Sequence, residues 1–167
     1  RERKLHRNFQ GYSTKPECDL LAFGISAIGK VGAAYVQNVK TLDEYYDRLD
    51  AQALPVLRGV ELNADDLIRR DVIQKLMCDF GLDAAPPIGD HDLDFATAEG
   101  RHGIVFAEYF APEIAALGPL AHDGLVELTD RAIVVTPRGR LLVRTVAMQF
   151  DRYLREAKER AQYSRVI

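Results

Sequence analysis

The sequence predicts an α+β fold in two parts. The closing strand and helix elements of a parallel α/β barrel come first, and a mostly helical, winged-helix-like domain follows. A continuous run of apolar and small residues at Leu20–Ile28 is typical of a strand buried on both faces of a parallel sheet. Helical patterning starts after Asn63, and a hairpin followed by a helix ends the chain. We therefore divide it into residues 1–62 and 63–167.

Composition limits the class of protein. The 167 residues are 47% hydrophobic, which is enough for a core, and the net charge of −3 lacks the basic character of a nucleic-acid-binding domain. No apolar run reaches the length that crosses a bilayer. Cys18 and Cys78 match no zinc or redox spacing and indicate reduced thiols in a cytoplasmic protein. Because the chain opens without Met in polar sequence, we expect a piece of a longer protein.

The first part is expected to continue with short elements. Gly29–Gly32 predicts a turn, and Ala33–Val39 predicts a strand. The T-L-D-E string at Thr41–Glu44 has the form of a capping box and predicts a helix through Gln52. An extended segment at Arg58–Leu62 ends this part.

The second part opens with the most clearly patterned helix of the chain. Asn63 is predicted to cap it, and Gly81 to end it. The Pro-, Gly- and Asp-rich stretch from Ala84 to Gly103 predicts a surface loop. Pro112 suits the first position of a short helix that reaches about Ala121.

The chain is predicted to end in a hairpin and a long helix. Leu125–Leu128 and Ala132–Val135 alternate as hairpin strands do. Thr136 is expected to cap the last helix, whose predicted buried stripe is Leu142, Val146, Phe150 and Tyr153.

No metal or catalytic set can be assembled from spacing. The alternating aspartates resemble a calcium loop, but Phe95 replaces its glycine and Arg101 its bidentate glutamate. No Ser–His–Asp or Cys–His arrangement is evident. We expect solvent-exposed side chains at His91 and His102, in the same stretch as Asp90, Asp92 and Asp94.

Five strings, in order, resemble the oxygen-independent coproporphyrinogen III oxidases, which are radical S-adenosylmethionine enzymes of haem biosynthesis. The resemblance extends over nearly the whole chain, apart from roughly residues 84–105. The strings are R-N-F-Q-G-Y-S-T at Arg7–Thr14, D-L-L-A-F-G-I-S-A-I-G at Asp19–Gly29, I-R-R-D-V-I at Ile68–Ile73, L-A-H-D-G-L-V at Leu120–Val126 and Y-S-R-V-I at Tyr163–Ile167.

The resemblance implies a cofactor site. Phe9, Gln10 and Ile28 match residues that contact a second S-adenosylmethionine in the family. An aromatic ring for stacking and an amide that donates and accepts suit such a ligand. The alternative is that Phe9 and Ile28 belong to the core. The family's 4Fe-4S cluster needs a C-x-x-x-C-x-x-C string that this chain lacks, so its ligands are expected on the missing N-terminal part.

The implied function is that of a C-terminal portion, inactive alone, of a radical SAM enzyme. The parent would decarboxylate two propionates of coproporphyrinogen III to give protoporphyrinogen IX. Its expected partners are that substrate and the remainder of the parent chain, with no nucleic acid and no membrane. A related haem chaperone and a stand-alone interaction module are the alternatives.

The predicted order of helices and strands is that of a winged helix, which suggests DNA binding as a function. The expected recognition helix does not support that function. Pro112–Ala121 contains no Lys or Arg for phosphates or bases. Arg138, Arg140 and Arg144 form a modest basic patch, either in ordinary surface ion pairs or close to tetrapyrrole propionates.

Overall fold

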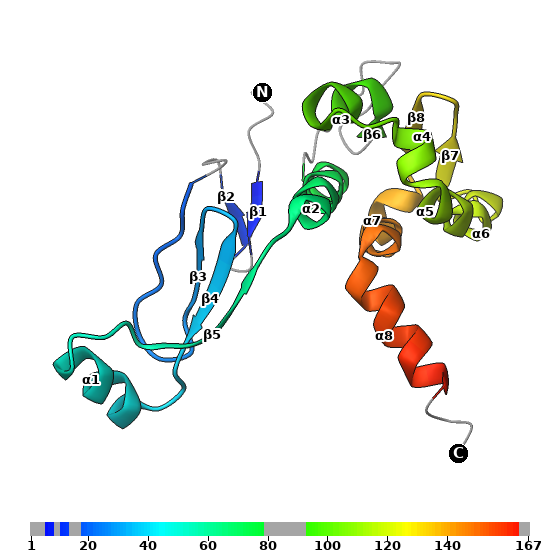
Figure 1. Ribbon diagram of the computed structural model, residues 1–167. Coiled ribbons are helices and arrows are strands. Elements are labelled where there is room, and N and C mark those ends of the chain that lie inside the picture. Colours follow the sequence, from blue (N-terminus) through cyan, green and yellow to red (C-terminus); the bar gives the residue numbers. More distant parts are fainter. Residues whose placement is uncertain (1–5, 9–10, 14–17, 79–92, 164–167) are drawn as a thin grey trace. The chain divides into compact units, whose positions relative to one another are not determined.

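The computed structural model describes residues 6–8, 11–13, 18–78 and 93–163. The chain divides into two compact units, which are named here by their main content. The sheet unit is Glu17–Leu67, and the helical unit combines Arg1–Pro16 with Ile68–Ile167. In the helical unit, β1 (His6–Asn8) pairs antiparallel with β2 (Gly11–Ser13). Figure 1 shows the elements along the chain.

The sheet unit contains an antiparallel sheet of order β3-β4-β5. Its strands are β3 (Ile28–Val31), β4 (Ala34–Asn38) and β5 (Val56–Glu61), and α1 (Leu42–Asp50) connects the last two. Gly32, with φ of 56°, lies in the tight turn between β3 and β4, because only glycine adopts this conformation at no steric cost. The strand predicted at 33–39, the helix after it and the extended segment at 58–62 are confirmed, and the last of these lies mostly within strand β5.

The predicted buried parallel strand at Leu20–Ile28 is wrong. Leu20 makes only an isolated bridge with Lys30, and the side chains of Leu21 and Phe23 are 66% and 83% exposed. Positive φ angles at Gly24 (94°) and at Ser26 (58°) turn the backbone out of the extended conformation. The predicted turn at 29–32 is correspondingly mostly strand β3.

The capping box predicted for α1 is also absent, although the helix forms. Thr41 is the N-cap residue, but its side chain makes no capping hydrogen bond. Glu44 instead accepts a hydrogen bond from Arg48 at 2.8 Å, one helical turn along. No residue of α1 is buried, and its apolar face carries exposed Leu42, Tyr46 and Leu49.

The helical unit takes in most of α2, whose start is capped as predicted. Asn63 Oδ1 accepts from the Asp66 amide at 2.9 Å, and the Asn63 amide donates to Asp66 Oδ2 at 3.1 Å. The elements are α2 (Ala64–Met77), β6 (Leu93–Asp94), α3 (Phe95–His102), α4 (Phe106–Tyr109), α5 (Ala111–Ala116), α6 (Gly118–His122), β7 (Val126–Leu128), β8 (Ala132–Val135), η1 (Gly139–Leu142), α7 (Val143–Ala147), η2 (Met148–Phe150) and α8 (Arg152–Tyr163). The β7–β8 hairpin is confirmed, whereas the single helix predicted from Pro112 to about Ala121 forms as two helices, α5 and α6.

An aromatic cluster forms the centre of this unit. Phe106 stacks on Phe95 with a centroid separation of 4.3 Å and lies 4.7 Å from Phe110. Phe110 meets Phe150 edge to face at 5.3 Å. Leu76 of α2 and Ile133 of β8 are buried in the same core. Because fully buried aromatic side chains contribute most to core stability, this cluster determines how the short helices pack.

Two expectations for this unit fail. Residues 95–102, predicted as loop, form α3, because the buried Phe95 and Ala98 anchor it to the core. The predicted last helix is interrupted at Asp151, which is extended (ψ of 98°) and whose Oδ1 accepts from the Leu154 amide at 3.0 Å. Val146 and Phe150 are buried as predicted, whereas Leu142 and Tyr153 are exposed because the 3-10 segments and the interruption rotate the stripe.

Among the described residues, no helix has both the length and the apolar composition needed to cross a membrane.

Candidate functional site

The structure describes one of the three predicted cofactor residues. Phe9 and Gln10 lie outside the described residues. Ile28 is the half-buried first residue of β3 and pairs with Gln37 of β4. At the next position, Gly29, a Cβ would lie 2.9 Å from the Leu20 carbonyl oxygen. The backbone of Leu20 therefore approaches this glycine closely.

Side chains from β4 and α1 fix the segment that precedes Ile28. The buried Asn38 donates from Nδ2 to the carbonyl oxygens of Ala22 (3.3 Å) and Gly24 (2.9 Å). The Gly24 amide donates to the Tyr45 hydroxyl at 3.0 Å. These bonds satisfy backbone groups that a strand would have paired in a sheet. Sequence reasoning missed Asn38, and a polar residue within an apolar strand pattern was the available signal.

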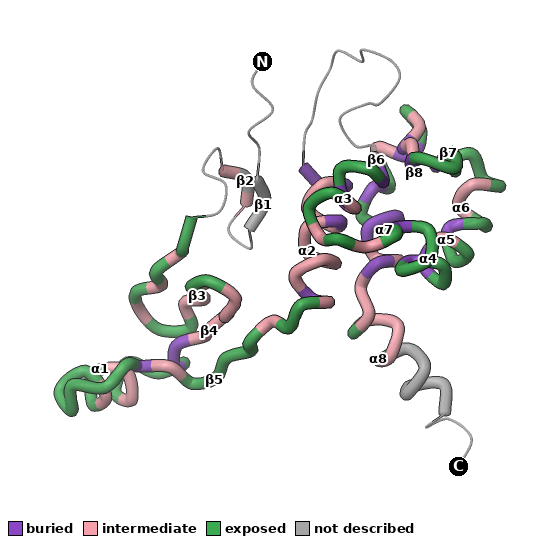
Figure 2. Tube along the Cα trace, turned by 45° about the horizontal axis from the view of Figure 1, so that its top comes forward, coloured by how far each residue is buried: buried purple, intermediate pink, exposed green. Residues whose placement is uncertain are grey.

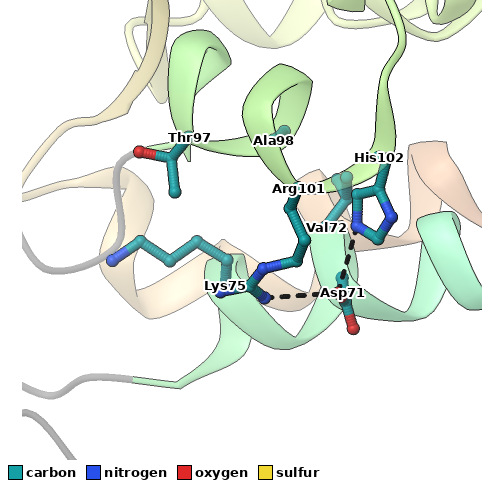
Figure 3. Close-up of a pocket in the computed structure, with 7 residues that line it drawn as sticks. All are labelled: Asp71, Val72, Lys75, Thr97, Ala98, Arg101 and His102. Atoms are coloured by element: carbon teal, nitrogen blue, oxygen red, sulfur yellow. Dashed lines mark hydrogen bonds and ion pairs between the residues drawn. The ribbon is translucent and has the colours of Figure 1, made fainter.

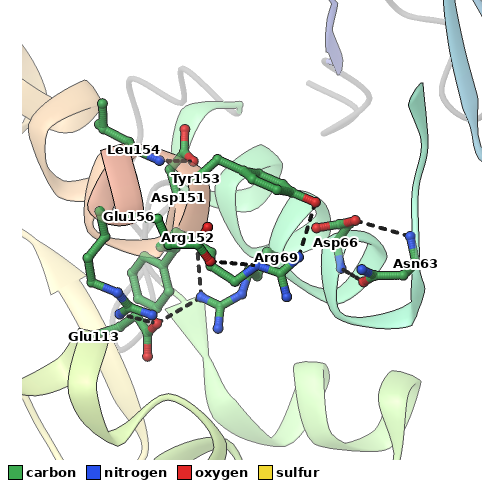
Figure 4. A network of polar contacts seen from close by, with 11 residues as sticks. Asn63, Asp66, Arg69, Glu113, Asp151, Arg152, Tyr153, Leu154 and Glu156 are labelled. Carbon is green, nitrogen blue, oxygen red and sulfur yellow. Dashed lines mark hydrogen bonds and ion pairs between the residues drawn. The ribbon is translucent and has the colours of Figure 1, made fainter. Parts of the chain in front are cut away.

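A buried charge network joins three helices of the helical unit (Figure 4). Glu113 of α5 is 1% exposed, and its Oε1 accepts hydrogen bonds from Arg69 of α2 at 2.8 Å and Arg155 of α8 at 2.7 Å. Arg69 also donates to the Phe150 carbonyl oxygen at 3.2 Å and lies over the Phe110 ring. Guanidinium groups suit such a role because they are planar and weakly hydrated.

Two opposing effects set the pKa of Glu113. Burial raises the pKa of this carboxyl, while the hydrogen bonds from Arg69 and Arg155 lower it, and the net pKa is below its ordinary value. Glu113 is therefore a carboxylate at neutral pH. Its Oε2 atom is buried and has no hydrogen-bond partner among the described residues. With two arginines on its other oxygen, it is suited to holding helices together and unsuited to accepting a proton near neutrality.

A small cavity lies between α2 and α3 (Figure 3). Its volume is about 80 Å³, and Asp71 pairs there with Arg101 at 3.2 Å and with His102 Nε2 at 3.1 Å. Ligand pockets for drug-sized molecules are about 300–1,000 Å³, so this cavity is too small for a nucleoside or a tetrapyrrole. The expectation of an exposed His102 was wrong, since its side chain is 16% exposed. His91 lies outside the described residues, as do Asp90 and Asp92.

The described residues do not fit a metal cluster. They contain no group of three or more His, Cys, Asp or Glu side chains placed to hold a metal ion. Cys18 is exposed, and the buried Cys78 donates from Sγ to Gln74 Oε1 at 3.1 Å. The sequence has only these two cysteines, one fewer than the family's iron–sulfur motif requires.

Relatives of known name cover the chain from end to end. It is 47% identical over 167 residues to the oxygen-independent coproporphyrinogen III oxidase of Salmonella typhimurium, and 48% identical over 167 residues to that of Escherichia coli strain K12. The enzyme of the same name from Synechocystis is 44% identical over the same length. In each case the chain spans 34% of the relative's length, about a third.

Structure and domain comparisons agree with this similarity. A solved structure described as "Coproporphyrinogen III oxidase (HemN) from Escherichia coli is a Radical SAM enzyme" superposes with a TM-score of 0.80 and 45% identity. The match covers 91% of this chain and 32% of that one. Residues 90–142 match the family described as the HemN C-terminal domain. The chain therefore matches the C-terminal portion of the oxygen-independent coproporphyrinogen III oxidases, and its mixed helix and strand fold includes a segment similar to the HemN C-terminal domain.

Proposed function

We propose that this chain is the C-terminal portion of an oxygen-independent coproporphyrinogen III oxidase. The parent would decarboxylate two propionates of coproporphyrinogen III oxidatively and give protoporphyrinogen IX in haem biosynthesis. The observation that carries the proposal is the 47% identity over all 167 residues to an enzyme of that name. S-adenosylmethionine and a 4Fe-4S cluster would supply the radical chemistry, with the cluster bound outside this chain.

Exposed apolar surface in the sheet unit supports a role as part of a larger protein. Phe23 is 83% exposed and Leu54 is 81% exposed, and Leu57 and Val60 of β5 are exposed as well. Figure 2 shows exposed residues along α1 and β5. Apolar surface on this scale normally marks an interface. The remainder of the parent chain is its natural partner, and we assign residues 1–62 to the closing edge of a radical SAM barrel.

Residues 63–167 are proposed to form a winged-helix-like domain. The support is the sheet order β6-β8-β7, in which a short strand before the helices pairs with the second strand of the later hairpin. The helix before the hairpin, α6, lacks Lys and Arg. A substrate-covering role therefore suits this domain better than DNA binding.

For the cofactor site, we propose that Phe9, Gln10 and Ile28 form one wall of the S-adenosylmethionine cavity. Phe9 would supply a stacking or packing surface, and Gln10 a donor and an acceptor. Ile28 would present the backbone at the start of β3. Beside it, Leu20 and Val36 approach Gly29 closely, so the start of β3 packs tightly against its own chain.

Turnover by the full-length protein tests the function. Purified anaerobically with a reduced cluster and S-adenosylmethionine, it should convert coproporphyrinogen III to protoporphyrinogen IX. Alanine at Phe9 and at Gln10 should lower kcat/KM, whereas alanine at the exposed Glu127 of β7 should not. Stoichiometric haem binding without decarboxylation would instead identify a haem chaperone and overturn the proposal.

A further inference from the structure

The outer side of η1 and α7 carries a basic and apolar surface, named here the arginine platform. It consists of Arg138, Arg140, Leu141, Leu142 and Arg144. Leu141 is 91% exposed and Leu142 is 48% exposed. The buried residues of the same segment are Gly139, Val143, Val146 and Ala147, which recur at helical spacing on the opposite side.

The three arginines have no carboxylate partner within the described part of the chain. The arginines that form ion pairs there are Arg48, Arg69, Arg101, Arg152 and Arg155. Arg138 and Arg144 are exposed, and the buried Nε of Arg140 has no hydrogen-bond partner among the described residues. Three guanidinium groups within seven residues, without an ion pair among the described residues, favour binding of an anion that carries more than one negative group.

The backbone beneath the platform is held rigidly. Thr136 Oγ1 donates to the Gly124 carbonyl oxygen at 2.7 Å, and it accepts from the Gly139 amide at 3.0 Å. The Thr136 amide donates to the Leu125 carbonyl oxygen at 3.1 Å. A Cβ at Gly139 would collide with that same carbonyl group, so η1 lies directly on the start of the hairpin. A surface positioned in this way loses little conformational entropy when it binds a ligand.

We propose that the arginine platform binds the carboxylate arms of the tetrapyrrole substrate, an inference that rests on the proposed function. Coproporphyrinogen III is an apolar macrocycle with propionates at its edge, and two of them remain as carboxylates in the product. Guanidinium groups bind carboxylates bidentately. Leu141 and Leu142 contact the macrocycle, while Arg138, Arg140 and Arg144 hold propionates.

Binding to the full-length protein tests the platform. The probe is coproporphyrin III, the stable oxidised macrocycle, followed by its fluorescence anisotropy. Arg138→Gln, Arg140→Gln and Arg144→Gln should each weaken binding about tenfold, the effect of one lost charge-assisted hydrogen bond. The control is Arg131→Gln, which removes the same charge from the exposed turn of the β7–β8 hairpin and should leave the Kd unchanged.

Two further measurements separate charge from packing. The tetramethyl ester of coproporphyrin III lacks the carboxylates, so wild type and the three variants should bind it equally. Leu141→Ser should weaken binding of both the acid and the ester. In turnover, the arginine variants should raise KM and leave kcat nearly unchanged.

The outcomes distinguish this inference from the proposed function. If wild type decarboxylates coproporphyrinogen III but the three variants bind coproporphyrin III like Arg131→Gln, the platform is wrong and the function stands. If wild type does not decarboxylate coproporphyrinogen III but the arginine variants still bind coproporphyrin III more weakly, the proposed function is wrong. The platform then stands as a tetrapyrrole-binding surface. In the three arginine variants, an equal loss of affinity for the acid and the ester also overturns the platform, because it identifies a packing change.

Discussion

Replacing Glu113 by glutamine should loosen the three helices that its carboxylate connects. The change keeps the shape of the side chain and removes its charge. A hydrogen bond to a charged group contributes about 1.5–3 kcal/mol, which applies in full to the nearly buried Arg69. Arg155 is 40% exposed, so solvent screening limits its share to about 0.2–1 kcal/mol. The total expected loss is about 2–4 kcal/mol.

Hydrogen exchange in the full-length protein measures this loss locally. Amides of α2 and α5 should exchange roughly 30- to 700-fold faster in Glu113→Gln, since each 1.4 kcal/mol is tenfold. Glu108→Gln, at an exposed glutamate of the neighbouring α4, is the matched control. Exchange within threefold of this control would refute the idea that the charge network holds the helices.

The stability difference between wild type and Glu113→Gln should also depend on pH. Because the pKa of Glu113 is lowered in the folded state, its charge stabilises the fold fully above the ordinary carboxyl pKa. The stabilisation is lost as the pH falls through the lowered folded-state pKa. The difference in exchange between wild type and Glu113→Gln should therefore be constant around pH 7 and shrink on acidification below about pH 4. A difference that grows on acidification would contradict the assignment.

Three further perturbations test other parts of the structure. Gly139→Ala should destabilise the helical unit by about 3 kcal/mol or more in urea unfolding, because its Cβ has no space. Gly118→Ala, in open space, should be neutral or slightly stabilising. Asn38→Ala should cost the sheet unit about 1–3 kcal/mol, seen as faster local hydrogen exchange, because two carbonyl groups lose their donor. Iodoacetamide should alkylate the exposed Cys18 in the native protein and the buried Cys78 only after unfolding, as peptide mass spectrometry would show.

Sequence patterning was sufficient where one local signal acted alone. The Asn63 cap and the β7–β8 hairpin each follow from residues within a few positions of one another, and both are present. It failed where a distant contact decided the conformation. The apolar run from Leu20 suggests a buried strand, yet Asn38, sixteen residues beyond Ala22, bonds its carbonyl and fixes a looped path.

The charge network shows the same limit. Arg69 and Glu113 are 44 residues apart, and nothing in the local sequence of either indicates a partner. Asp151 shows a different limit. The apolar spacing predicts one continuous last helix, but the Asp151 side chain caps a new helix and so interrupts it. For the cofactor residues, the resemblance supplied what periodicity could not, and their role stays a prediction.

The strand order of the small sheet has a practical consequence. β5 pairs only with β4 among the described strands, so it borders the sheet. Its Leu57 and Val60 side chains are 43% and 51% exposed. Such a border is a template on which another chain can add a strand. The isolated 167-residue chain should therefore aggregate on storage at high concentration, seen as a rise in turbidity. The substitution Leu57→Lys should prevent this aggregation.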